Sequence, residues 1–194
     1  MVLEAIETLV TGPYAVAGES YGGYLARGLV AEHRRRVTGM ALVCPMLVAE
    51  HQARHVPPHQ VMHRDAFCEA LSRGSEFDET TVVQTAETYR RVQKEIVAGL
   101  ALADMAAVER IREGWAGTFP REPGGSTYDG PVLVFTGRQD SSTGYRDAWP
   151  LLDHYPHATF AVLDGAGHNG HIEQAVLFNA FVEEWLDRVE GRTG

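Results

Sequence analysis

The sequence contains little cysteine, and this excludes two kinds of small protein. Its two cysteines, Cys44 and Cys68, are too few for a disulfide framework or a cysteine-based metal site. Cys44 lies in an apolar run, where a free thiol behaves as a small buried hydrophobic side chain. We therefore expect a fold that is held by its hydrophobic core, with no metal and no cofactor.

Long hydrophobic runs are also missing. No apolar stretch approaches the ~20 residues that a membrane-spanning helix needs. Residues 1–7 carry acidic side chains and lack the basic segment that begins a signal peptide. These absences predict a cytoplasmic protein with no membrane partner.

Basic residues are outnumbered in this chain. There are 17 Lys and Arg residues against 26 Asp and Glu residues, which gives a formal net charge of −9. A protein that binds nucleic acid needs basic residues to neutralise phosphates, so we expect no nucleic-acid partner. The one basic run, residues 34–36, ends a predicted helix, where positive charge complements the helix dipole.

The residues that are present are typical of a globular α/β protein. The 194 residues, 44% of them hydrophobic, are enough for one core or for a core with an inserted subdomain. The apolar pattern predicts a helix over residues 2–10, a strand over 13–18, a helix over 21–35 and a strand over 37–44. A strand, a helix and a parallel strand in this order form a right-handed βαβ unit.

Residues 46–125 have a different character. They are rich in charged residues and helix formers, and they predict helices over 59–72, 81–97 and 105–113, closed by a loop over 120–126. We expect this all-helical insertion to form a lid that supplies apolar walls and excludes water. The core would then consist of residues 1–45 and 126–194.

The strand pattern returns after the insertion. Residues 131–137 and 158–163 are strongly apolar and predict two more parallel strands. A helix is expected between them over 143–154, and residues 171–189 predict a closing helix with one apolar face.

A Gly-Glu-Ser-Tyr-Gly motif joins the first predicted strand to its helix at residues 18–22. The chain must reverse sharply there, and Gly18 and Gly22 would remove Cβ atoms that clash in such a turn. The pattern is that of a nucleophile elbow, which holds a serine hydroxyl, here that of Ser20, exposed above a sheet. On its own the motif is equally compatible with a glycine-rich turn and a solvated serine.

Two further residues supply what a serine nucleophile requires. Asp140 follows the third predicted strand and His168 follows the fourth. Because ligand sites form at the carboxyl ends of parallel strands, we expect Ser20, Asp140 and His168 to face one crevice. A histidine that accepts the serine proton and a carboxylate that orients the histidine complete a catalytic triad.

These motifs make the chain resemble a capped α/β-hydrolase fold protein with a serine nucleophile. The resemblance rests on residues 18–23, on 136–140 and on 165–168 followed by Glu173 and an aromatic-bearing helix. It implies that Ser20 is the nucleophile, His168 the general base and acid, and Asp140 the orienting carboxylate. It also implies that Tyr21 contributes a backbone N–H to the oxyanion hole.

Other residues compete for these roles. Asp147 and Asp164 are alternative acids, and His171 is an alternative base, although it is expected inside the closing helix. Four histidines recur at every fourth position, which on one helix would line up metal ligands: His51, His55, His59 and His63. Two prolines at 57–58 break any such helix, so these histidines are expected on a solvated face of the lid.

The sequence departs from the resemblance at its beginning. The family's sheet normally has eight strands, and only the last four are recognisable here. The loop that normally supplies a second oxyanion N–H precedes the elbow in the family, and losing one such donor typically costs ~10²–10³ in kcat. The sequence either belongs to an impaired protein or begins late in a longer enzyme.

The missing strands would also leave the first strand at an open edge. Residues 14–17 carry no charge and no interior proline, so they lack the features that protect natural sheet edges. We expect them to pair with another chain, either a second copy or an upstream fragment.

The resemblance therefore predicts a serine hydrolase. Its substrate would be a small ester, amide, lactone or related carbonyl compound, cleaved through an acyl-enzyme. The alternative is a truncated, catalytically impaired protein that serves as a binding or oligomerising module.

Overall fold

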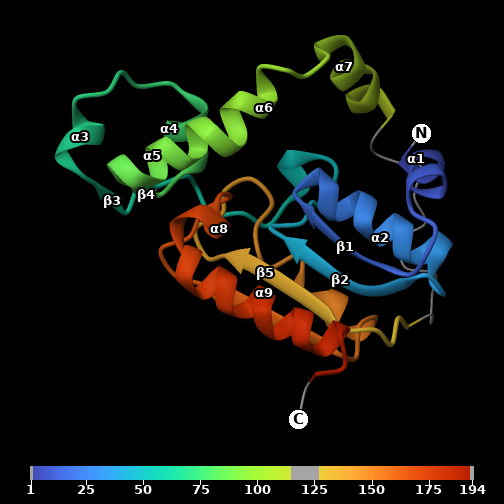
Figure 1. Ribbon diagram of the computed structural model, residues 1–194. Coiled ribbons are helices and arrows are strands. Elements are labelled where there is room, and N and C mark those ends of the chain that lie inside the picture. Colours follow the sequence, from blue (N-terminus) through green and yellow to red (C-terminus); the bar gives the residue numbers. More distant parts are fainter. Residues whose placement is uncertain (1, 115–126, 193–194) are drawn as a thin grey trace.

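A four-stranded parallel sheet forms the centre of the protein (Figure 1). The computed structural model describes residues 2–114 and 127–192. The strand order is β1-β2-β5-β6, and the strands are β1 (Tyr14–Glu19), β2 (Val37–Val43), β5 (Val132–Gly137) and β6 (Ala158–Leu163). The four predicted strands and the α/β class are confirmed.

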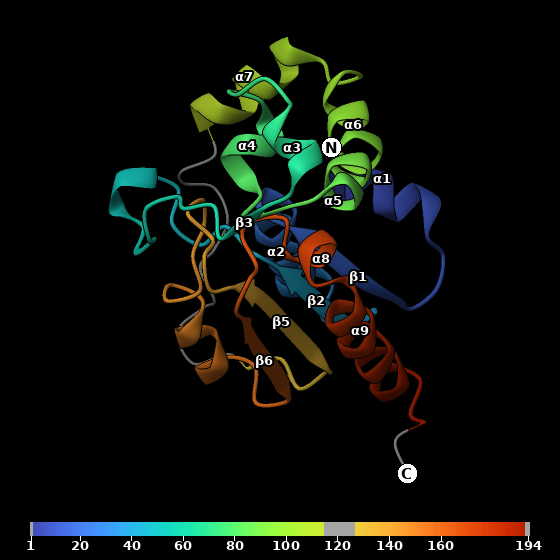
Figure 2. The ribbon, with the colours of Figure 1, turned by 90° about the vertical axis from the view of Figure 1, so that its left-hand side faces the viewer.

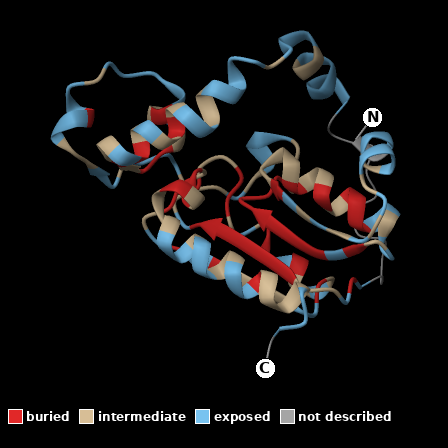
Figure 3. Ribbon diagram, in the orientation of Figure 1, coloured by how far each residue is buried: buried red, intermediate tan, exposed pale blue. Residues whose placement is uncertain are grey.

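The two central strands are buried on both faces (Figure 3). Met40 and Leu42 of β2 face a core that includes α2 (Tyr21–His33) and the 3₁₀ helix η3 (Trp149–Asp153). Ala41 and Val43 face the opposite core, which is closed by α9 (Ala175–Val189). This alternation follows from the two-residue period of a strand, and it explains why β2 and β5 are mostly apolar and carry no charged residue.

The strands are aligned so that their carboxyl ends meet at one edge of the sheet. Ala17 of β1 pairs with Ala41 of β2, which pairs with Leu133 of β5, which pairs with Thr159 of β6. The loops that follow the four strands are therefore neighbours, as the sequence-based argument for a shared crevice requires.

Strand β1 lies at an edge of the sheet. Within the described ranges, 2–114 and 127–192, it pairs with β2 alone, and Ala15 and Ala17 are exposed. Helix α1 (Val2–Leu9) precedes it, and the Arg36 side chain donates hydrogen bonds to the carbonyls of Val10 and Gly12 between the two elements.

The segment between β2 and β5 consists of short elements. They are η1 (His51–Ala53), β3 (His63–Arg64), α3 (Ala66–Glu69), α4 (Glu76–Thr80), β4 (Val83–Gln84), α5 (Ala86–Val92), the π-helix η2 (Gln93–Val97), α6 (Ala98–Leu100) and α7 (Met105–Gly114). The expectation of an all-helical insertion was wrong in one respect, because β3 and β4 form a two-stranded parallel sheet. Strands of two residues are too short to produce a recognisable alternation in the sequence.

Several helix boundaries also differ from the predictions. The helix expected over 59–72 is reduced to α3, which begins after its N-cap Asp65, and the helix expected from 81 begins after the N-cap Thr85. The helix expected over 143–154 is reduced to η3, and the closing helix is divided at Gln174 into α8 (Gly170–Glu173) and α9. The predicted 105–113 helix corresponds to α7, whereas the 120–126 loop lies outside the described residues.

The β2–β5 segment has a small core of its own that continues into α8. Cys68, Phe77 and Val92 are buried together with Ile172 of α8. Figures 1 and 2 show α3, α4 and α5 beyond the end of the sheet at which α8 lies. The function of the β2–β5 segment as a lid stays a prediction.

Among the helices of the described residues, none is both long enough and apolar enough to cross a membrane.

Candidate active site

Ser20 occupies the junction between β1 and α2 in a strained backbone conformation. Its φ and ψ angles are 52° and −118°, which is rare for a residue with a side chain. The surrounding backbone holds it there, because its N–H donates to the Val43 carbonyl at 3.0 Å. Its own carbonyl accepts from the N–H groups of Gly23 and Met46 at 3.0 and 2.9 Å. The sharp turn predicted for the elbow is therefore present.

The elbow glycines do not contribute equally. A Cβ added at Gly18 would lie 2.1 Å from the carbonyl oxygen of Gly22, so the turn requires glycine at position 18. At Gly22 a Cβ would meet no atom within 4 Å, so the clash expected there was wrong. The second close approach is at Gly23, where a Cβ would lie 2.8 Å from the Cβ of Pro45.

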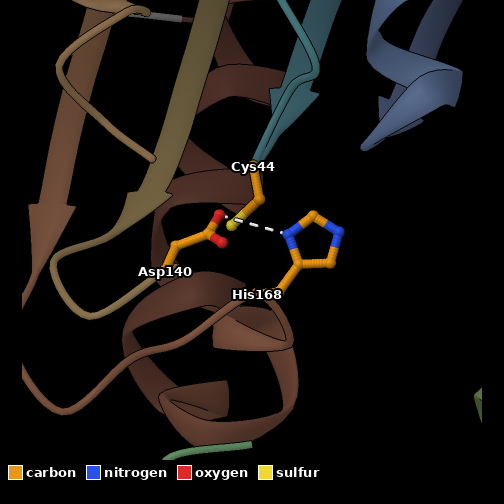
Figure 4. Close-up of side chains that lie close together, drawn as sticks. All are labelled: Cys44, Asp140 and His168. Atoms are coloured by element: carbon orange, nitrogen blue, oxygen red, sulfur yellow. Dashed lines mark hydrogen bonds and ion pairs between the residues drawn. The ribbon is translucent and has the colours of Figure 1, made fainter. Parts of the chain in front are cut away.

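Asp140 lies in the loop after β5 and is fully buried. Its Oδ1 accepts from the N–H groups of Ser142 and Thr143 at 2.8 and 3.1 Å. Its Oδ2 accepts from the Thr143 hydroxyl at 2.7 Å and lies 3.1 Å from Nδ1 of His168 (Figure 4). The structure thus brings Asp140 and His168 together, with the carboxylate held on both oxygens.

The charges of this pair support each other. Burial opposes the ionised form of Asp140. The hydrogen bond and charge of His168, together with two hydrogen bonds from Thr143, outweigh burial and lower the pKa of Asp140 to about 2. Burial likewise opposes protonated His168, and the hydrogen bond and charge of Asp140, followed by the charge of Glu19, raise its pKa above the ordinary value.

The end of β2 connects the elbow to the Asp140 loop. Ser20 is hydrogen-bonded to the backbone of Val43 and Met46, which flank Cys44. The Thr143 hydroxyl, which donates to Asp140, also lies 3.0 Å from the Cys44 carbonyl. The backbone of residues 43–46 therefore joins two sets of hydrogen bonds, one to the elbow and one to Thr143, which is bonded to Asp140.

The alternative acids and base have other partners. Asp147 lies 2.6 Å from Nδ1 of His55, and Asp164 accepts from the Gln139 side chain at 2.6 Å. His171 is in α8, and its Nδ1 lies 3.1 Å from a carboxylate oxygen of Glu19. None of these contacts involves His168 or Asp140.

The four regularly spaced histidines do not converge. Nε2 of His51 lies 3.1 Å from the Ser141 carbonyl, His55 contacts Asp147, and His63 is in β3. In the described part of the chain, the group with metal-ligand spacing is a different one, formed by Cys44, Asp140 and His168.

Glu173 is a residue whose role the sequence did not reveal. Its carboxylate accepts hydrogen bonds from the N–H groups of Val82, Val83 and Gly167 at 2.5, 2.8 and 2.6 Å. The first two belong to the β2–β5 segment, and Gly167 directly precedes His168. Its place five residues after His168 was visible in the sequence, but the partners 90 residues away were not.

Comparison with known proteins identifies the family. The model of the serine aminopeptidase S33 family matches residues 2–175, which is most of the chain. The chain belongs to this family. Membership confirms the resemblance to α/β hydrolases and supports hydrolase activity. A comparison with curated protein sequences found no significant match.

Solved structures show the same fold. An α/β superfamily hydrolase from Oenococcus oeni PSU-1 superposes on this S33-family chain with a TM-score of 0.86 at 23% identity, over 97% of this chain and 72% of that one. The proline iminopeptidase-related protein of Thermus thermophilus superposes with a TM-score of 0.64 at 20% identity, over 97% of this chain and 69% of that one. The 2-hydroxy-6-oxo-6-phenylhexa-2,4-dienoate hydrolase of Rhodococcus sp. strain RHA1 superposes with a TM-score of 0.63 at 22% identity, over 95% of this chain and 68% of that one. The four-stranded sheet thus corresponds to part of the fold of these relatives.

Proposed function

We propose that this chain is a serine hydrolase in which Ser20 is the nucleophile, His168 the general base and acid, and Asp140 the orienting carboxylate. The observation that carries the proposal is the contact between Nδ1 of His168 and Asp140. It occupies one ring nitrogen and leaves Nε2 as the acceptor for a serine proton. The strained backbone of Ser20, held at the end of the neighbouring strands, supports the same assignment.

The proposed reaction proceeds through an acyl-enzyme. The Ser20 oxygen attacks the substrate carbonyl carbon while its proton passes to Nε2 of His168, which then protonates the leaving group. A water molecule, deprotonated by His168, then attacks the acyl-enzyme, and the carboxylic acid leaves as Ser20 regains its proton. The backbone N–H of Tyr21, at the positive end of the 13-residue helix α2, would donate to the oxyanion.

The proposed substrate is a small, moderately apolar ester, amide, lactone or related carbonyl compound that binds beneath the β2–β5 segment. A pocket of about 440 Å³ lies between this segment and the loop after Asp140 and is large enough for such a compound, although Ser20, Asp140 and His168 are not among its lining residues. Glu79 and Thr80 line it from one side, and Ser141 and Ser142 from the other. The family description adds aminoacyl amides to the compounds that should be tested.

Covalent labelling tests the proposal directly. A fluorophosphonate should add one adduct per chain, detected by intact-mass measurement and located on Ser20 by peptide mapping. Ser20→Ala should abolish the adduct, and His168→Ala should slow its formation because the serine then lacks its base. Hydrolysis of a panel of p-nitrophenyl esters and aminoacyl p-nitroanilides would define the acyl group.

Ser72→Ala is the matched control, because Ser72 is exposed and lies outside the site. It should label at the wild-type rate. If well-folded wild-type protein takes up no label, the chain is not an active serine hydrolase, and the alternative of a binding or oligomerising module gains support.

A further inference from the structure

Cys44 lies beside the Asp140–His168 pair, and no step of the proposed hydrolysis uses it. Its Sγ, a carboxylate oxygen of Asp140 and an imidazole nitrogen of His168 all lie within 4.8 Å of one another. Figure 4 shows the three side chains converging, with Cys44 at the end of β2 and Asp140 after β5. They are a soft, a hard and an intermediate ligand atom, the combination that borderline-soft divalent cations accept.

We propose that Cys44, Asp140 and His168 form an inhibitory binding site for a borderline-soft divalent cation, with Zn²⁺ as the leading candidate. Ligand atoms around a tetrahedral zinc ion lie ~3.5 Å apart, given bond lengths of about 2.0–2.3 Å. The 4.8 Å limit on the separations of the three atoms exceeds this value by about 1.3 Å, whereas Nδ1 of His168 and Oδ2 of Asp140, at 3.1 Å, are already closer than that. The side chain of His168 is 15% exposed, whereas Cys44 and Asp140 are fully buried, so an ion and a fourth ligand from water would have to enter past His168.

The charges of the site suit a dication. Cys44 and Asp140 are fully buried, and a buried charge is costly unless an opposite charge balances it. A bound dication with one thiolate and one carboxylate gives a neutral centre, and the thiol proton leaves to solvent.

Binding would stop catalysis through the tautomer of His168. In the metal-free protein the Nδ1 proton faces Oδ2 of Asp140, which leaves Nε2 free to accept a proton. An ion between these atoms takes the place of the Nδ1 proton, and the neutral imidazole then carries its proton on Nε2. An Nε2–H group cannot accept the Ser20 proton, so the nucleophile loses its base. No atom is oxidised or reduced.

The inhibitory effect rests on the proposed hydrolase function, whereas binding of the ion does not. The first measurement is therefore spectroscopic. Titration of the full chain with Cd²⁺ should produce a sulfur-to-metal charge-transfer band in the ultraviolet at one equivalent. Ser20→Ala should keep the band, so a chain that proves inactive still gives an interpretable result.

Cys68 provides the matched control, because it is also free and fully buried but lies in the β2–β5 segment. Cys68→Ala should retain the band, whereas Cys44→Ala and the more conservative Cys44→Ser should lose it while keeping the wild-type circular dichroism spectrum. In the activity assay, both Cys44 variants should require at least ~10-fold more Zn²⁺ for half inhibition than wild type, each compared with its own metal-free rate.

Three results would overturn the proposal. These are absence of the band in wild-type protein, its persistence in both Cys44 variants, or equal Zn²⁺ inhibition of wild type and both variants. The last would place the inhibitory ion elsewhere, for instance on exposed histidines such as His55, whose side chain is 74% exposed.

Discussion

The carboxylate of Glu173 accepts a 2.6 Å hydrogen bond from the N–H of Gly167, the residue that precedes His168. The same side chain accepts from the N–H groups of Val82 and Val83 in the β2–β5 segment. One half-buried carboxylate therefore links the loop that carries the proposed base to the segment proposed to form the lid. Movement of that segment must either break these hydrogen bonds or shift the His168 loop.

We predict that Glu173→Gln lowers both kcat and the rate of fluorophosphonate labelling by roughly 10–100-fold, because hydrogen bonds to charged groups contribute ~1.5–3 kcal/mol. In the variant, the amide nitrogen of glutamine would face a backbone N–H that in the wild-type protein donates to a carboxylate oxygen of Glu173. Labelling by a small fluorophosphonate reports on the Ser20–His168 geometry even where substrate contacts to the lid are lost.

Glu183→Gln is the control for this change, because Glu183 is an exposed residue of α9. It should leave both rates unchanged. A Glu173→Gln protein that is destabilised but labels at the wild-type rate would show that Glu173 supports the fold without positioning His168.

Asp140→Asn should reduce kcat by about 10⁴-fold, the size of effect found for the corresponding change in a serine protease triad. An asparagine offers an N–H to Nδ1, which favours the tautomer that is protonated on Nε2. Steady-state kinetics on the best ester of the panel would measure the loss.

Asp147→Asn and Asp164→Asn test the alternative acids under the same conditions. Their contacts are with His55 and Gln139 and not with His168 or Asp140, so each should retain kcat within a few-fold. If either variant lost kcat by as much as Asp140→Asn, the residue changed in it would be the orienting carboxylate instead of Asp140.

The geometry of the elbow predicts different effects on stability for alanine substitutions at Gly18 and Gly22. Gly18→Ala would place a Cβ against the backbone of Gly22 and should destabilise the fold by ~1–3 kcal/mol or prevent folding. Gly22→Ala meets open space in the first turn of α2 and should be neutral or stabilising by up to about 1 kcal/mol. Urea denaturation followed by circular dichroism would compare them, and equal destabilisation by both would contradict the described turn.

We also propose that the open edge of β1 pairs with another chain, either a second copy or an upstream segment. If the partner is a second copy, light scattering at micromolar concentration should give a mass above the 21.3 kDa of one chain. The double change Ala15→Lys and Ala17→Lys places charges on this edge and should shift the mass to that of a monomer.

Ala106→Lys, at an exposed position of α7, adds one positive charge away from this edge and should leave the mass unchanged. A wild-type protein that is monomeric throughout this concentration range would exclude pairing with a second copy.

The order of the sheet elements was predictable because each leaves a local pattern. The strands of the sheet are uncharged runs, and the turn at Ser20 has glycines on both sides. The β2–β5 segment was less predictable, because its short elements depend on contacts that are distant in sequence. The two-residue strands β3 and β4 pair residues 20 positions apart, and Glu173 binds the N–H of Val83 at a separation of 90.

By itself, the sequence determined the α/β class, the four parallel strands and the placement of Ser20, Asp140 and His168 at strand ends. These follow from hydrophobic periodicity and from the rule that parallel strands present their carboxyl ends at one edge. The tertiary structure decided which carboxylate faces His168, that Cys44 lies within reach of both, and that Glu173 ties the His168 loop to the β2–β5 segment. Those choices depend on distances between loops that only the packing of the sheet brings together.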